Sequence, residues 1–144
     1  MAKKFLTYEE ICRLPLLQQA LRHEEERHRA RMAEIQSMAK TLDALQLERA
    51  EIERNGYRLF GESISRGFAS NTLIYTGCMG EGDEVQLATA LLRSGWKVTD
   101  RDSGVYPSPT FRKGRINLKI SCTRAGALEK AEQAIAADAT REAA

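Results

Sequence analysis

The chain has 144 residues, enough for one domain of ordinary size, and no apolar run approaches the roughly 20 residues that span a bilayer. Charged residues make up 29% of the chain and aromatic residues 6%, which predicts a soluble protein with a modest core and an extended helix. The formal net charge of +2 excludes a strong overall attraction to nucleic acid or to membranes, so any anion site has to be a local patch.

The three cysteines, Cys12, Cys78 and Cys122, are odd in number and far apart, and no CxxC pair occurs. The first residues, MAKKFLTYEE, lack the apolar segment of a secretory signal. We therefore expect three free thiols in a cytoplasmic protein.

Residues 1–56 predict a long helical segment for oligomerisation. The stretch TYEE (7–10) has the form of a capping box before a short helical turn. From Pro15 to Arg54 there is neither a glycine nor a second proline, and the pair NG at 55–56 is a typical stop. One helix of about 40 residues is expected, and a helix that long needs a partner along much of its length.

Heptad spacing indicates how this helix finds a partner. Apolar residues recur on one seam, while the centre, RHEEERHRAR (22–31), is almost entirely charged. The pattern fits a coiled coil with a polar middle, or a helix with one end on its own C-terminal domain and the other on a second chain. A helix that packs only on its own sheet is the simpler alternative. We expect a dimer or larger oligomer through Leu14, Leu17, Leu21, Ile35, Met38, Leu42, Leu45 and Ile52.

The remainder predicts an α+β fold: the long coiled-coil-like helix, a connector at 57–71, and a small β-α-β-β-α module at 72–138 with a three-stranded mixed sheet. Residues 139–144 are expected to fray. The predicted strands are 72–76, 96–101 and 115–123, with a helix at about 82–94 and another at the end.

The first two of these strands should be parallel if they are adjacent, because a helix connects them, and the last two should be antiparallel. Both helices then cover one face of the sheet. The other face presents a polar set that the long helix or a ligand could cover: Lys97, Thr99, Arg101, Asn117 and Lys119.

The loop TGCMGEGDE (76–84) has the strand–glycine–helix arrangement that suits phosphate. It matches neither GxGxxG nor the P-loop motif, however, and its three carboxylates stand where an anion would arrive. We interpret it as a tight turn with an acidic helix start. An enzyme built around Cys78 is the weakest hypothesis, because the same carboxylates oppose a reactive thiolate.

No catalytic, metal or cofactor site is predicted. The two histidines, His23 and His28, are five residues apart on the long helix and would point in different directions. The sequence contains no other set of residues that indicates acid, base and nucleophile.

The stronger candidate site is the segment DSGVYPSPTFRKGR (102–115), which is long for a hairpin loop and contains two prolines. Aromatic residues interleaved with arginine and lysine can stack on bases and neutralise phosphates, and they are also typical of protein-binding hot spots. Folding of the aromatic rings back onto the core is the alternative. The predicted binding residues are Tyr106, Phe111, Arg112, Lys113 and Arg115, with Lys97, Arg101 and Lys119 from the sheet face.

These features predict a non-catalytic, oligomeric binding protein with no membrane association. In the first hypothesis it is a regulator or inhibitor that occupies the surface of a protein partner through the stiff aromatic-basic loop. In the alternative it binds nucleic acid or a nucleotide with the same loop and the basic sheet face.

Overall fold

The computed structural model describes residues 5–144, which fall into two compact units that divide between Ser37 and Met38. The first unit contains α1 (Tyr8–Cys12) and α2 (Leu16–Ser37). The predicted capping box precedes α1: the Thr7 backbone N–H donates to the Glu10 carboxylate at 2.7 Å, and the Glu10 N–H donates to the Thr7 hydroxyl. Within the described residues, no helix is both long enough and apolar enough to cross a membrane.

The predicted single helix is interrupted at Met38, where the backbone leaves helical geometry (φ −104°, ψ 8°), and α3 (Ala39–Arg54) follows. The stop at 55–56 is confirmed, since Asn55 caps α3 and Gly56 has a φ of +112°. The Met38 side chain is buried in the core of the second unit, so tertiary packing accounts for a break that local propensity does not predict.

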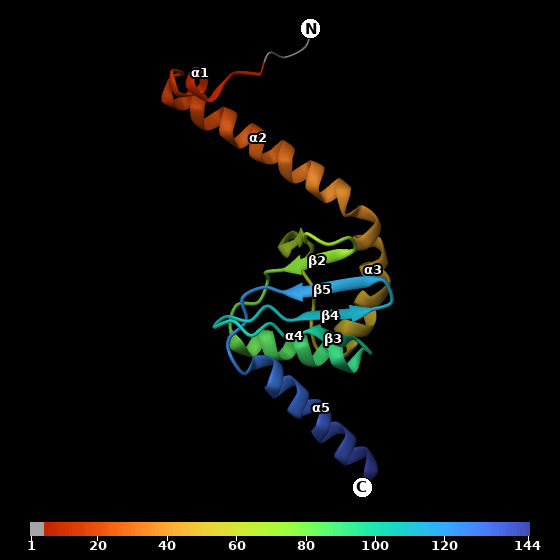
Figure 1. Cartoon of the computed structure of the whole chain (residues 1–144). Coiled ribbons are helices and arrows are strands. Elements are labelled where there is room, and N and C mark those ends of the chain that lie inside the picture. Colours follow the sequence, from red (N-terminus) through yellow and green to blue (C-terminus); the bar gives the residue numbers. More distant parts are fainter. Residues whose placement is uncertain (1–4) are drawn as a thin grey trace. The chain divides into compact units, whose positions relative to one another are not determined.

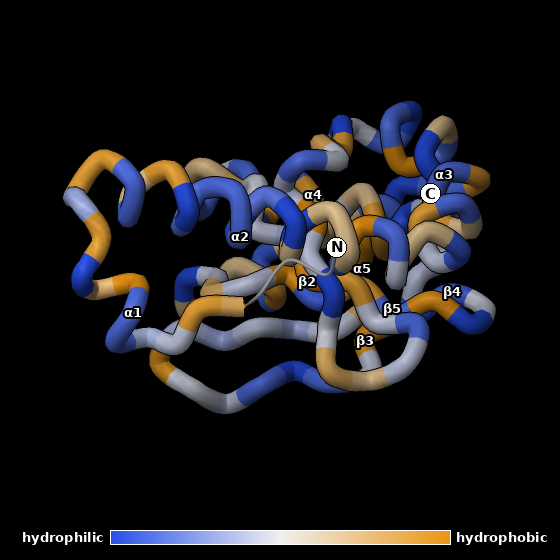
Figure 2. Tube along the Cα trace, turned by 90° about the horizontal axis from the view of Figure 1, so that it is seen from above, coloured by the Kyte–Doolittle hydropathy of each residue, from blue (hydrophilic) through white to orange (hydrophobic). Residues whose placement is uncertain are grey.

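The break divides the predicted oligomer seam. Met38, Leu45 and Ile52 are buried in the core of their own chain, so the prediction that these three form an oligomer interface is wrong. Leu42 is partly buried against the same core. In α2 and just before it, Leu17, Leu21 and Ile35 are exposed and Leu14 is half-buried. Hydrophilic residues fill most of the middle of α2 (Figure 2).

The second unit has an α+β fold with a mixed sheet of five strands rather than three (Figure 1). The predicted strands correspond to β2 (Thr72–Tyr75), β3 (Lys97–Asp100) and β5 (Ile116–Ile120). The two that sequence reasoning missed are β1 (Ile64–Arg66), which follows a short 3₁₀ turn at Gly61–Ser63, and β4 (Thr110–Lys113). The helices are α4 (Glu81–Arg93) and α5 (Ala127–Ala143); α5 extends through the tail that was expected to fray.

The strand order is β1-β2-β5-β4-β3, so β2 pairs in parallel with β5 and not with β3. Strand β3 lies at the far edge, where it pairs antiparallel with β4. The expected antiparallel pairing of β3 with β5 is also wrong, because β4 lies between them. Residues 114–115 form the tight β4–β5 turn, with Gly114 in the left-handed region that a two-residue hairpin requires at this position.

All three helices of the second unit cover the same face of the sheet. The inward side chains of the strands form one core cluster with apolar residues of α3, α4 and α5. A cross-strand row of this face consists of Val98, Phe111, Leu118 and Leu73. On the opposite face the strand side chains are half-buried or exposed, so that face is open.

Candidate binding surface

Strand register arranges the side chains of the open face in two rows. Neighbouring strands place side chains about 5 Å apart across a row, and the rows are about 7 Å apart along the strands. The first row is Lys97, Arg112, Asn117 and Thr72, and the second is Asp100, Thr110, Lys119, Ile74 and Ser65. We refer to these nine residues as the open face.

Three cations lie on the open face: Lys97, Arg112 and Lys119. None of the three forms an ion pair within residues 5–144, although the Arg112 Nε donates to the Gly114 carbonyl at 3.1 Å. The single carboxylate, Asp100, accepts a hydrogen bond from the Asp102 backbone. The open face therefore carries an excess of positive charge, available to an anionic ligand.

A hollow of about 350 Å³ lies over the second row, next to the loop 67–71. The ring of Phe68 in this loop is fully exposed to solvent. The hollow is lined by Gly67, Phe68, Ala69, Thr72, Ile74, Asp100, Thr110, Asn117 and Lys119.

The structure separates the predicted site residues onto two sides of the sheet. Phe111 is fully buried, because its position in β4 alternates with the outward Arg112. The prediction that Phe111 lies in a long ligand-binding loop is therefore wrong. Residues 110–113 of that segment form strand β4, and the alternative in which the ring packs on the core is confirmed for this residue.

Lys113 faces the helix side for the same reason. Its ammonium donates to the Glu48 carboxylate of α3 at 2.6 Å and to the Ser94 carbonyl at 2.8 Å, with Glu51 at 3.4 Å. The hydrogen bond to Glu48 raises the pKa of Lys113 above its ordinary value. This lysine joins β4 to α3 and is not available on the open face.

Arg101 also leaves the open face. Regular alternation of side chains along β3 would place Arg101 on the same face as Lys97. An irregularity between Val98 and Asp100 shifts the register, so Arg101 lies on the helix side instead. Its guanidinium is then paired with Glu132 at 2.6 Å and Glu129 at 3.3 Å on α5, and the hydrogen bond to Glu132 raises the pKa of Arg101.

The loop between β3 and β4 covers residues 101–109 and presents Tyr106, which is 67% exposed, and Val105, which is 81% exposed. Its base is held by Asp102, whose carboxylate accepts the backbone N–H groups of Ser108 at 2.8 Å and Gly104 at 3.2 Å. These bonds lower the pKa of Asp102, that from Ser108 most. Arg115, also predicted as a binding residue, is exposed in the β4–β5 turn.

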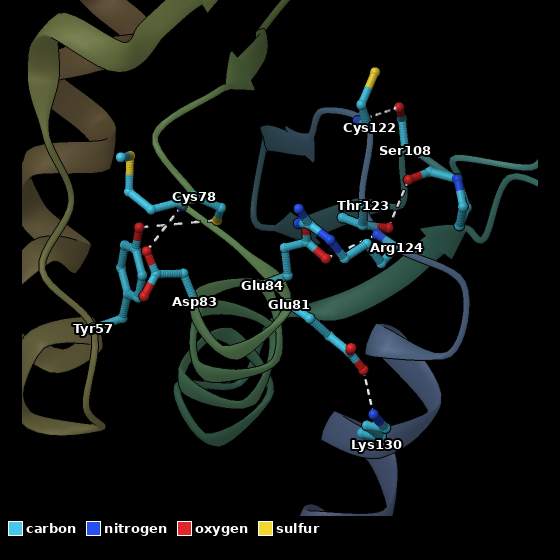
Figure 3. A network of polar contacts seen from close by, with 12 residues as sticks. Tyr57, Cys78, Glu81, Asp83, Glu84, Ser108, Cys122, Thr123, Arg124 and Lys130 are labelled. Carbon is cyan, nitrogen blue, oxygen red and sulfur yellow. Dashed lines mark hydrogen bonds and ion pairs between the residues drawn. The ribbon is translucent and has the colours of Figure 1, made fainter.

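The carboxylates at the glycine loop and the start of α4 all bind groups of the same chain, as Figure 3 shows. Asp83 accepts the Met79 backbone N–H at 2.9 Å, and the buried Glu84 accepts both the backbone N–H and the guanidinium of Arg124 at 2.8 Å. Glu81 pairs with Lys130. The positive end of α4 is thus neutralised within the chain, which leaves little electrostatic attraction for phosphate.

Cys78 lies half-buried in the same loop, with its sulfur 3.9 Å from the Tyr57 hydroxyl (Figure 3). Burial raises the pKa of this thiol to about 11, and the charge of Asp83 acts in the same direction. A thiol with that pKa is a poor nucleophile at neutral pH. Among residues 5–144 no group of three or more histidine, cysteine, aspartate or glutamate side chains is placed to hold a metal ion.

Comparison with known proteins adds no assignment: no protein-family model, no curated protein and no solved structure matches this chain.

Proposed function

We propose that the protein is a non-catalytic binding protein whose open face binds a single strand of nucleic acid. The observation that carries the proposal is the placement of Lys97, Arg112 and Lys119 on one solvent-facing side of the sheet, with no ion-pair partner among residues 5–144. Positive side chains at such spacing can neutralise successive phosphates of an extended strand.

The neighbouring groups suit the rest of a nucleotide. Phe68 has an exposed ring at the edge of the hollow, and any of the bases can stack on an aromatic side chain. Asn117 and Thr110 supply an amide and a hydroxyl that can donate to or accept from a base edge. Two carboxylates lie nearby: Asp100 is toward the β3 edge, and Asp102, whose pKa the charge of Lys119 helps to lower, accepts backbone N–H groups of its own loop.

The test is fluorescence anisotropy with a labelled 20-residue thymidine oligonucleotide at low salt. The double variant R112E/K119E should lower the affinity at least tenfold, and F68A should lower it severalfold through lost stacking. The control R141E makes the same type of charge change on exposed α5 and should bind like the parent protein. Equal affinity of the parent protein and R112E/K119E would contradict the proposal.

A protein partner is the second candidate, and one observation favours it. Val105 and Tyr106 project from a loop whose base Asp102 fixes, which lowers the entropy lost when the loop contacts a partner. An exposed tyrosine on an ordered loop is a common hot-spot residue. Loss of partner capture by Y106A, with oligonucleotide binding unchanged, would assign this loop to a protein.

We also propose that α2 assembles the chain with a second copy. A helix of 22 residues with no buried side chain has little stability of its own in water, and its exposed leucines supply an apolar surface for a partner helix. Self-association would bring two open faces into one particle and raise the avidity for a long strand.

A further inference from the structure

One side of α2 combines exposed apolar residues with charged ones. The apolar residues lie toward the two ends of the helix, Leu17 and Leu21 before its middle and Ile35 after it. At heptad spacing these three residues share one side of the helix with Glu24 and His28. None of the five side chains is buried within the described chain, so this side of α2 is open to a partner.

The middle of α2 consists of an acidic segment followed by a basic one. Residues 24–26 are all glutamate, and three of the four arginines of the segment 22–31 follow them, at positions 27, 29 and 31. Ion pairs within the helix, such as Arg27 with Glu24 at 2.9 Å, neutralise these charges only in part. Glu25 and Arg29 form no ion pair among residues 5–144. The helix therefore carries opposite charge on the two sides of its middle.

These charges distinguish the two orientations in which a second copy can pair with α2. In a parallel pair in register, Glu24 faces the partner's Glu24, and the two basic segments face each other. Like charges at facing positions are destabilising. In an antiparallel pair, the acidic segment of each copy lies beside the basic segment of the other, and the attraction favours this orientation.

One antiparallel register also brings the apolar residues together. If Leu17 faces the partner's Ile35, then Glu24 faces the partner's His28, because seven residues separate the two positions on each helix. The apolar ends of α2 thus cover each other in the same register that places the acidic segment beside the basic one.

The remaining positions are compatible with this register. Leu21 faces the partner's Arg31, whose alkyl stem can cover a leucine while its guanidinium is paired with Glu34 at 2.6 Å. Glu25 and Arg27 approach their own counterparts, but only at the flanks of the helix pair, where salt and solvent screen like charges.

We propose that two copies of α2 pair antiparallel, with Leu17 of each copy against the partner's Ile35 and residues 24–26 beside the partner's residues 27–31. The inference rests on the proposed self-association through α2 and adds the orientation and register of the pair. The charges select the orientation, since the apolar residues would also face their own counterparts in a parallel pair.

The experiment measures distances between spin labels in the full chain by electron paramagnetic resonance. The native cysteines are replaced (C12S/C78A/C122S), and one label is attached at a time through Q36C or A30C, at exposed positions of α2. In the antiparallel pair, the two labels at 36 are about 30 Å apart along the helix axis and those at 30 about 12 Å. In a parallel pair, neither position has an axial separation, so both distances are short and similar.

A second measurement keeps the native cysteines. The self-association constant, measured by sedimentation, should fall as salt is added, and E24Q should lower it about threefold at low salt because attraction between the copies is lost. In a parallel pair, both changes would remove repulsion and strengthen association. The control E142Q removes a carboxylate from exposed α5 and should have no effect.

Two outcomes would overturn the proposal, and they differ in what else they exclude. Short and similar distances at 30 and 36, or association that strengthens with salt and in E24Q, would overturn the antiparallel orientation and leave self-association intact. A parent protein that is monomeric at every concentration would overturn self-association as well. Neither outcome affects oligonucleotide binding by the open face, which has its own test.

Discussion

The ammonium of Lys113 lies 2.6 Å from the carboxylate of Glu48, whereas the neighbouring Arg112 forms no ion pair within the described chain and lies on the opposite face of the same strand. Two adjacent basic residues that look equivalent in the sequence thus have different roles. One connects the sheet to α3, and the other is available to a ligand.

This relationship predicts opposite effects for two neighbouring substitutions. K113M should lower the free energy of unfolding by about 1–2 kcal/mol, because it removes a half-buried ion pair and a hydrogen bond to Ser94, while oligonucleotide affinity stays unchanged. R112M should lower the affinity and leave stability within about 0.5 kcal/mol. Urea denaturation and anisotropy on both variants check the prediction, and a matched loss of affinity in the two would contradict it.

The same ion pair predicts how stability depends on pH. The pKa of Lys113 is higher in the folded state, so the contribution of the pair is fully present below the unfolded pKa of about 10.4. It is lost as the pH rises through the raised pKa. The difference in unfolding free energy between the parent protein and K113M should therefore be constant from pH 7 to 9 and shrink in strong alkali.

Glu84 provides a stability test away from the open face. Its carboxylate is only 4% exposed and accepts two hydrogen bonds from Arg124, which joins the start of α4 to the segment before α5. E84A should lower the free energy of unfolding by about 2–3 kcal/mol, because the Arg124 N–H loses its acceptor. E81A, which removes the more exposed pair with Lys130, should cost about 0.5 kcal/mol. Equal losses in the two variants, measured by urea denaturation, would show that burial of Glu84 is unimportant.

Cys78 should react slowly with iodoacetamide. With a pKa of about 11, roughly 0.1% of this thiol is ionised at pH 8, and the side chain is half-buried. Mass spectrometry of alkylated peptides should find Cys12 and Cys122, which are exposed, modified first. The order should disappear in urea. Rapid modification of Cys78 in the native protein would reopen the hypothesis of a reactive thiol.

Self-association through α2 predicts a change in mass in solution. L17E/L21E places two charges among exposed leucines, so light scattering should find the monomer mass while the second unit keeps its unfolding midpoint. Q18E/Q36E, on the same helix, should retain the oligomer. A parent protein that is already monomeric would rule out assembly through this helix.

The sequence predicted the parts of the fold that depend on local pattern. The capping box at Thr7, the helix stop at Gly56 and the alternating β5 strand are all present, because capping geometry, glycine conformation and side-chain period are local properties. The break at Met38 was not predictable in this way. The break depends on the packing of residues 38–54 against a core that is built from residues far along the chain.

The residues of the open face were predicted only in part, and register is the reason. Lys97 and Lys119 lie on the open face, as expected, and Arg112, which was expected in a loop, lies beside them on β4. Phe111 and Lys113 point to the helix side because side chains alternate along β4. This was not predicted, since residues 110–113 were taken for part of a loop. A single register shift at Val98 moves Arg101 to the helix side, and nothing in the local sequence indicates that shift.

The most direct test of the central claim is a nuclear magnetic resonance titration of the labelled protein with a short thymidine oligonucleotide. Shift changes should concentrate on the backbone amides of Thr72, Arg112, Asn117 and Lys119 and on the Phe68 loop, and they should weaken as salt is added. Changes confined to residues 103–108 would show that the oligonucleotide binds the β3–β4 loop instead of the open face. No saturable change on the open face would contradict the account.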